Sequence, residues 1–156
     1  MWRAVETIAI WVKMKTTRPF SRALELMRRA ELRPTRQRLA LARLLFEQGD
    51  RHVTAEGLHE EAMSASIEVS LATVYNTLHQ FVEAGLLREI AVDTSRSYFD
   101  TNISEHHHFF FECSGRIEDI PGDQVVVSDL PPAPEGTRVR RVDVIVRLDY
   151  SRNQDQ

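Results

Sequence analysis

Three consecutive histidines, His106, His107 and His108, carry the clearest chemistry in this sequence. Imidazole is a common protein ligand of transition metals and of haem iron. Side chains alternate along an extended strand, so His106 and His108 would share one face, roughly 6–7 Å apart, with His107 on the other. The run predicts a metal or haem site, although a solvated, tag-like run of histidines is the alternative.

Acidic residues near this run supply a second kind of ligand. Asp100 and Asp119 flank the histidines, and carboxylate oxygens would favour Fe²⁺, Mn²⁺ or Zn²⁺ over softer metals. The other histidines, His52, His59 and His79, each fit an ordinary surface or half-buried role. The alternative is a second haem or metal site built from those three.

A helix is predicted from Ser70, whose hydroxyl can cap the first turn, to Gly85, which suits a helix end. One face is apolar, with spacings of three and four: Leu71, Val74, Leu78 and Val82. The opposite face carries short uncharged side chains, with Tyr75 on its flank: Thr73, Asn76, Thr77 and Gln80. Such a face suits base edges and phosphates in a DNA groove, the alternative being a solvent-facing surface that lacks charge.

The charge distribution supports the DNA interpretation. The 156-residue chain has a net charge of −3 and 42% apolar residues, which excludes a disordered or uniformly basic protein. Eight arginines and only two glutamates, however, lie between Arg18 and Arg43, a local excess that can neutralise phosphates. The single cysteine, Cys113, excludes an internal disulfide and is typical of a reducing compartment, so we expect a cytoplasmic protein. No apolar run is long enough to span a membrane.

The remaining patterns predict a winged helix-turn-helix. Three further helices are expected over residues 21–30, 35–49 and 54–66, the last two capped by Thr35 and Thr54. Inward residues are expected to be Leu24, Leu26, Met27, Leu39, Ala42, Leu45, Phe46, Leu58, Ala62 and Met63. A β-hairpin over Leu86–Val92 and Ser97–Asp100 would form the wing.

The C-terminal part is predicted to be a small sheet. Residues 105–113 and 138–150 are strand-like, and Val125–Val127 is a candidate third strand before a proline-rich loop. So small a sheet needs a second subunit, which predicts a homodimer. The fold class is therefore α+β: a winged-helix DNA-binding domain (14–100) followed by a β-rich dimerisation and metal/haem-sensing domain (101–152). Residues 1–13 are an extension of unknown role.

The order of the motifs TRQR, HVTAEGL, SLATVYNTL, EAGLLREI, HHH and GRIED resembles the ferric uptake regulator (Fur) family. The resemblance covers residues 20–120. The triple histidine followed by three phenylalanines, together with Asn76, looks like the iron response regulators of rhizobia. This resemblance implies a homodimeric repressor that binds AT-rich palindromic operators and controls haem synthesis and iron homeostasis genes.

The resemblance also implies roles for individual residues. A regulatory metal site would use His52, Asp100, His108 and Asp119, with Asp100 replacing the usual glutamate. A second site would use His106 and His107, and haem would be held by His106–His108. DNA contacts would fall on Arg36, Ser70, Thr73, Tyr75 and Asn76.

Departures from the family pattern are equally informative. Phe111 and Ser114 occupy the positions of cysteines that hold a structural zinc in relatives, and one cysteine cannot build a four-thiolate site. We therefore predict no cysteine-ligated structural zinc, with Phe109 and Phe111 packing instead. The usual dimerisation-domain helix has no counterpart in residues 121–136. A Cys-Pro haem motif is also missing, so any haem would bind histidine.

Three alternatives remain open. A direct Mn, Fe or Zn sensor without haem would use the same ligands. A His-rich metalloenzyme is disfavoured because the sequence contains no HExxH motif, no Ser/His/Asp order and no glycine-rich phosphate loop. A protein–protein adaptor built on a winged helix is the third.

Overall fold

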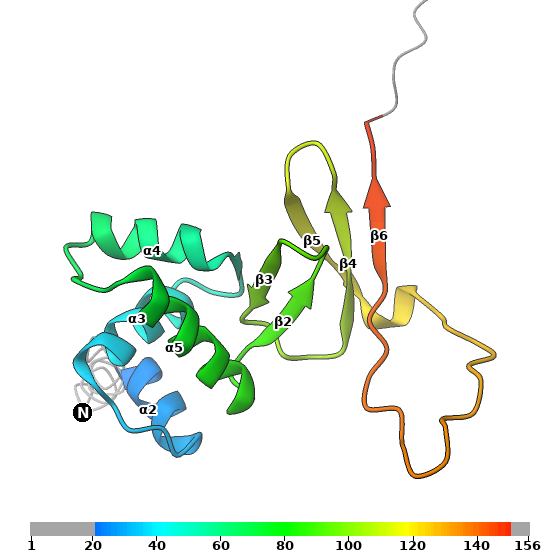
Figure 1. The fold of residues 1–156 in the computed structure, drawn as a ribbon, viewed down its shortest axis with the longest axis horizontal. Coiled ribbons are helices and arrows are strands. Elements are labelled where there is room, and N and C mark those ends of the chain that lie inside the picture. Colours follow the sequence, from blue (N-terminus) through cyan, green and yellow to red (C-terminus); the bar gives the residue numbers. More distant parts are fainter. Residues whose placement is uncertain (1–20, 151–156) are drawn as a thin grey trace, which may run out of the picture. The chain divides into compact units, whose positions relative to one another are not determined.

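The computed structural model describes residues 21–150 of the chain (Figure 1). The extension at residues 1–13 and Arg18 of the basic segment lie outside the described residues. The chain divides into two compact units. Unit 1 contains the residues up to Ile90 together with Tyr98–Asn102, and unit 2 contains Ala91–Ser97 and the chain from Ile103.

Unit 1 is mainly helical, and its helices begin where the sequence predicted. They are α2 (Ser21–Arg29), α3 (Arg36–Phe46), α4 (Ala55–Ser64) and α5 (Leu71–Glu83). The side-chain oxygens of Thr35, Thr54 and Ser70 each accept a hydrogen bond from the backbone N–H three residues later. These contacts satisfy amides that the first helical turn leaves without a partner, which confirms all three predicted caps.

The core of unit 1 corrects the predicted helix faces. On α5 the buried residues are Val74, Thr77, Leu78 and Phe81, an i, i+3, i+4, i+7 stripe. Leu71, predicted to face inward, is exposed, whereas Thr77, predicted to face outward, is buried. Phe81 shifts the stripe, because a large aromatic side chain buries more apolar area than Leu71 at the first turn.

The other helices supply the rest of this core, and here too some buried residues differ from those predicted. Met63 of α4 is exposed rather than inward, while Ala23 of α2 and Leu41 of α3 are fully buried. Leu24, Leu26 and Leu39 are only partly buried. The predicted inward residues Met27, Ala42, Leu45, Phe46, Leu58 and Ala62 are buried. No helix among residues 21–150 is long and apolar enough to cross a membrane.

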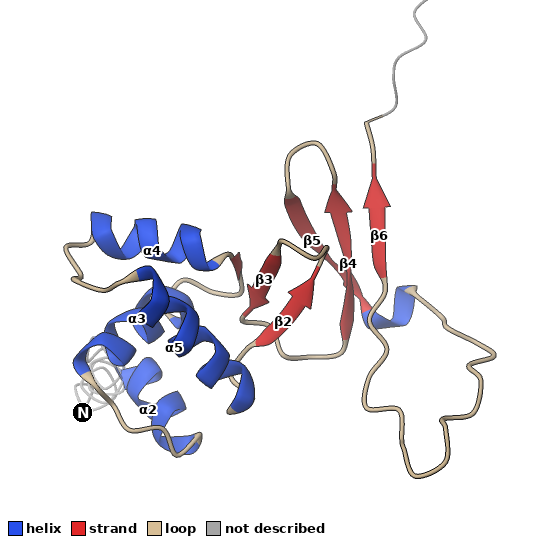
Figure 2. Ribbon diagram, in the orientation of Figure 1, coloured by secondary structure: helices blue, strands red, loops and turns tan. Residues whose placement is uncertain are grey.

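A three-stranded sheet combines the predicted hairpin with a short strand from the segment between α3 and α4. Its strands are β1 (His52–Val53), β2 (Arg88–Ala91) and β3 (Ser97–Asp100), in the order β1-β3-β2. Antiparallel pairing of β1 with β3 places His52 opposite Asp100. The three helices α3–α5 followed by this hairpin are a winged-helix arrangement (Figure 2).

Unit 2 contains a second three-stranded sheet with the order β5-β4-β6 (Figure 2). Its strands are β4 (His106–Phe111), β5 (Arg116–Pro121) and β6 (Ile145–Leu148), and a short 3₁₀ helix η1 covers Gly122–Gln124. β4 pairs antiparallel with β5 and parallel with β6.

The strand prediction for this region was partly wrong. Val125–Val127 forms no strand, and β6 spans four residues instead of the long run predicted over 138–150. β5 was missed because its buried residues, Ile117 and Ile120, are three apart and break the period of two. Strand pairing limits β6, because it pairs only with His108–Phe111 of β4.

Alternation along β4 was predicted correctly for the histidines. His106, His108 and Phe110 are buried, while His107, Phe109 and Phe111 on the other face are half-buried. The aromatic residue that packs fully is therefore Phe110 rather than its two neighbours. The guanidinium carbons of Arg96 and Arg147 lie 5.5 and 5.7 Å from its ring centroid.

Candidate metal centre

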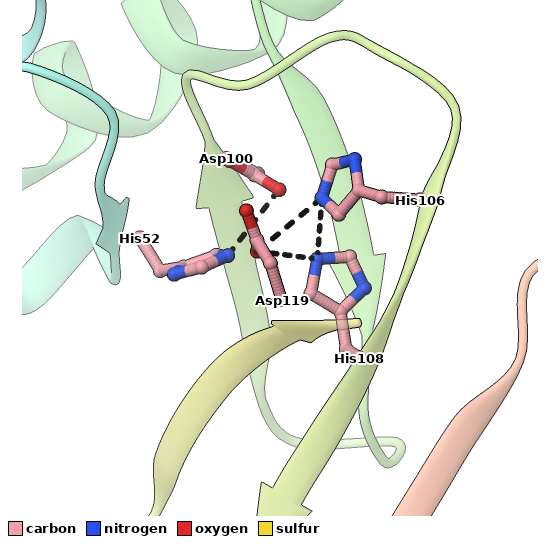
Figure 3. A group of neighbouring side chains, drawn as sticks. All are labelled: His52, Asp100, His106, His108 and Asp119. Carbon is pink, nitrogen blue, oxygen red and sulfur yellow. Dashed lines mark hydrogen bonds and ion pairs between the residues drawn. The ribbon is translucent and has the colours of Figure 1, made fainter. Parts of the chain in front are cut away.

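Strand β4 and its neighbour β5 bring three ligand groups together in unit 2. His106 and His108 are 4% and 1% exposed, and their Nε2 atoms lie 2.9 Å apart. The antiparallel register places Asp119 opposite His108. Asp119 Oδ1 lies 3.3 Å from Nε2 of His106 and 3.5 Å from Nε2 of His108 (Figure 3). We call these three residues the β4–β5 triad.

Hydrogen bonding of the outer ring nitrogen prepares His106 as a ligand. Its Nδ1 lies 2.7 Å from the backbone oxygen of Ser104, which can only accept, so Nδ1 carries the proton. In the neutral ring, Nε2 then presents a lone pair toward His108 and Asp119. Metal-bound histidines are commonly oriented by such a second hydrogen bond.

The donor set of the triad fits a divalent transition ion. Two imidazole nitrogens and a carboxylate oxygen surround one point, and lone pairs facing one another at this distance require a proton or a cation among them. Nitrogen and oxygen ligands of this kind suit Fe²⁺, Mn²⁺ and Zn²⁺.

A second pair of possible ligands lies in unit 1. Nε2 of His52 is 3.3 Å from Oδ2 of Asp100, across the β1–β3 pairing (Figure 3). Asp100 is completely buried, and its Oδ1 accepts a hydrogen bond of 2.8 Å from the backbone N–H of Asn102. A buried carboxylate needs such partners, because removing its charge from water is costly.

The remaining histidines have other contacts. Nδ1 of His107 accepts a 3.2 Å hydrogen bond from the backbone N–H of Val144, on the face opposite the triad. Nε2 of His59 lies 3.0 Å from the backbone oxygen of Val69, and the ring of His79 stacks on that of Tyr75. Among residues 21–150, none of the three belongs to a cluster of potential metal ligands.

The predicted DNA-contacting residues lie on α3 and α5 of unit 1. Arg36, Ser70 and Asn76 are exposed, Tyr75 is 36% exposed, and Thr73 is half-buried. Gln80, which we placed on the same face, accepts a 2.7 Å hydrogen bond from the guanidinium of Arg38. Arg38 also donates to the backbone oxygen of Arg33, so it ties α5 to the start of α3.

One polar partner of this surface was not predicted. The hydroxyl of Tyr75 donates a 2.6 Å hydrogen bond to Oε1 of Glu56, in the first turn of α4. This bond lowers the pKa of Glu56, and it raises the pKa of Tyr75 because the phenolate would lose the bond. The two residues are 19 positions apart on different helices, so no local pattern could have indicated the pair.

Comparison of sequences matches most of the chain to one family. The profile described as the ferric uptake regulator family matches residues 29–144. The peroxide-responsive repressor PerR of Staphylococcus aureus strain Mu50 is 33% identical over 99 residues, 64% of this chain and 66% of that protein. PerR of Staphylococcus epidermidis is 34% identical over 93 residues, 60% of this chain and 61% of that protein. The chain thus matches just under two thirds of the length of these relatives.

Solved structures share the fold. The ferric uptake regulator of Pseudomonas aeruginosa with manganese has a TM-score of 0.65 and 23% identity, covering 83% of this chain and 98% of that one. The ferric uptake regulator of Vibrio cholerae has a TM-score of 0.62 and 19% identity, covering 80% and 97%. At these identities the likeness establishes an α+β fold with a winged helix and a small β-rich C-terminal part.

Proposed function

The chain belongs to the ferric uptake regulator family, and on that basis we propose that it is a metal-responsive transcription regulator that binds DNA as a homodimer. Membership of a family of regulators sets aside the metalloenzyme alternative. The observation that carries the proposal is the β4–β5 triad, since two buried imidazoles and a carboxylate converge within 3.5 Å.

The proposed effector is Mn²⁺, Fe²⁺ or Zn²⁺. Such an ion usually has four to six ligands, so the three ligands of the triad leave its coordination incomplete. We extend the proposed ligand set to His52 and Asp100, which the family resemblance assigns to the regulatory site. An ion that binds one conformation of the protein more tightly than others would shift the population toward it, and that differential affinity is what a regulator requires.

The proposed DNA-binding surface is the start of α5 with the basic residues of α3. Ser70, Asn76 and Arg36 are exposed there. Short uncharged side chains suit base edges, and the arginine suits a phosphate. We propose that two such surfaces in a homodimer read a palindromic, AT-rich operator, and that the protein works in the cytoplasm.

The dimer would be formed by unit 2. The strands β4–β6 bury only a small apolar core, formed by Phe110, Ile117 and Ile120. Several apolar residues between β5 and β6 are exposed: Val126, Val127, Leu130 and Val139. Burial of these side chains against a second copy would supply the missing core.

The test combines metal binding with DNA binding on one preparation. Protein stripped by a chelator is titrated with each ion under anaerobic conditions, and an operator is selected from a random duplex pool. We expect one of the ions to change operator affinity at least fivefold, within the usual range of allosteric coupling. Failure to bind any divalent ion, or operator affinity unaffected by a bound ion, would contradict the proposal.

Haem is the alternative effector, proposed from the triple histidine and the resemblance to iron response regulators. His106 and His108 are almost fully buried, whereas His107 is half-buried and more accessible to a macrocycle. Titration with haemin separates the two effectors. A Soret shift that is lost in a His106–His108 triple alanine variant, with altered operator binding, would favour haem control of haem synthesis and iron homeostasis genes.

A further inference from the structure

The hydrogen bond between Tyr75 and Glu56 determines which hydrogen-bonding groups Tyr75 can meet on DNA. A phenol has one O–H donor and two acceptor lone pairs. The hydroxyl proton of Tyr75 lies on a 2.6 Å bond to the Glu56 carboxylate, a charge-assisted contact. Only the acceptor lone pairs of the phenol therefore remain available to another molecule.

The carboxylate is held in its charged form. Glu56 lies in the first turn of α4, where the helix dipole favours negative charge. The pKa of Glu56 is lowered first by the Tyr75 hydrogen bond and then by its own backbone N–H. At neutral pH the carboxylate is an acceptor only, so the hydroxyl proton of Tyr75 stays directed toward it.

The ring of Tyr75 is held from a second side. His79, one turn later on α5, stacks on it with centroids 6.4 Å apart and planes 20° apart. His79 itself packs edge-on against buried Phe99 at 5.7 Å. A phenol fixed through both its ring and its hydroxyl, and still 36% exposed, is pre-organised to present one oxygen to a partner.

We propose that Tyr75 reads an exocyclic amino group of adenine or cytosine in the major groove, and that Glu56 is the positioning residue that restricts it to this role. In that groove the donors are the N6 amino group of adenine and the N4 amino group of cytosine. Guanine O6 and N7, thymine O4 and the phosphate oxygens are acceptors. Each of them would be repelled by a phenol lone pair or by the negative charge of Glu56. This inference rests on the proposed DNA-binding function.

The first experiment removes amino groups from the selected operator one at a time. Adenine is replaced by purine and cytosine by 2-pyrimidinone, and affinity is measured by fluorescence anisotropy. With the wild-type protein we expect one replacement in each half-site to weaken binding roughly two- to twelvefold, the value of one net hydrogen bond. In Tyr75→Phe the same replacement should have no effect.

The second experiment tests the role of Glu56. In Glu56→Gln the amide can donate as well as accept, so the Tyr75 hydroxyl regains its freedom to donate. Discrimination against an acceptor at the contacted position, measured with hypoxanthine in place of adenine or uracil in place of cytosine, should then fall to the level of Tyr75→Phe. In the double variant, discrimination should fall no further. Glu60→Gln is the matched control, because Glu60 is also exposed on α4 and its replacement removes the same negative charge.

Failure of the proposed DNA-binding function and failure of the role proposed for Tyr75 would give different results in these experiments. A random pool from which no operator is enriched would overturn both. An enriched operator whose amino-group dependence persists in Tyr75→Phe would overturn this inference alone, as would additive losses in Glu56→Gln and Tyr75→Phe. Ultraviolet titration without DNA gives an independent readout, in which Glu56→Gln should lower the pKa of the Tyr75 phenol toward its ordinary value.

Discussion

The Nε2 atoms of His106 and His108 lie 2.9 Å apart on the buried face of β4. Two protonated rings at this distance would repel each other, and a neutral His106 that donates its Nδ1 proton to Ser104 has only an acceptor lone pair at Nε2. Either the Nε2–H of a neutral His108 or a bound metal ion can meet that lone pair. This pair is therefore the centre of the proposed metal site.

Replacing His108 by alanine should abolish high-affinity binding of the divalent ion. Loss of a direct ligand should exceed the roughly 10- to 100-fold cost of losing an outer-shell partner. Competition with a chelating dye measures the change. The control is His107→Asn, which retains an acceptor for the Val144 N–H and should keep the affinity. Equal losses in both variants would contradict the assignment of the triad.

Removal of the metal should lower thermal stability. An ion at a free concentration of about 100 times its Kd stabilises the protein that binds it by about 2.7 kcal/mol. In a chain of this size that corresponds to a rise in Tm of roughly 5–11 °C, reversed by chelator. Scanning calorimetry should show this rise in the wild type and none in Asp119→Asn. A full rise in the variant would place the ion elsewhere.

Arg36 and Arg38 should behave differently although they are neighbours on α3. Arg36 is exposed, so Arg36→Ala should reduce the salt slope of DNA binding by about 1 without affecting folding. Arg38 donates to Gln80, so Arg38→Ala should lower the free energy of unfolding by about 1–2 kcal/mol. Salt titrations and urea unfolding measure the two effects. Similar results for both variants would contradict the distinction.

The turn between β2 and β3 should resist acid. Hydrogen bonds from the Ser95 hydroxyl, from backbone N–H groups and from the Arg96 guanidinium hold the pKa of Asp93 well below its ordinary value of 3.8. A depressed folded pKa means that its contribution to stability is present above the ordinary value and is lost only as pH falls through the folded pKa. We expect the turn to remain ordered at about pH 3–4, where exposed carboxylates become protonated.

Carboxyl-carbon NMR of Asp93 checks this directly. Asp93→Asn keeps a side-chain acceptor but cannot titrate, so its turn resonances should not respond to pH in that range. A titration of Asp93 at the ordinary value, or loss of turn order in step with the other carboxylates, would show that these hydrogen bonds do not persist in solution.

Arg147 should hold the tip of the same hairpin within unit 2. Its guanidinium donates to the backbone oxygen of Val92 and, at 2.7 Å, to Glu112. Arg147→Ala should loosen the hairpin tip and so reduce hydrogen-exchange protection of the Val92 N–H, which donates to the backbone oxygen of Arg96, by roughly tenfold. Arg147→Lys should recover little, since a single ammonium cannot reproduce the planar fork. Unchanged exchange in both variants would rule out this anchoring role.

The sequence could predict the features that depend on neighbouring residues. Thr35, Thr54 and Ser70 cap helices through bonds spanning three residues, and alternation along one strand was enough to place His106 and His108 on a common face. Each of these contacts is decided within a few residues, where backbone geometry leaves few choices.

Tertiary structure decided the features that depend on distant partners. Asp119 reaches the histidines because β5, whose pattern lacks a period of two, pairs with β4 in one register. Glu56 meets Tyr75 only because two helices pack side by side. Burial of Thr77 and exposure of Leu71 likewise follow from which residues fill the core best. Composition and motifs thus determined the family, its helices and its candidate ligands, whereas long-range register and packing determined which side chains meet, because those depend on the free energy of the whole core rather than on local backbone preference.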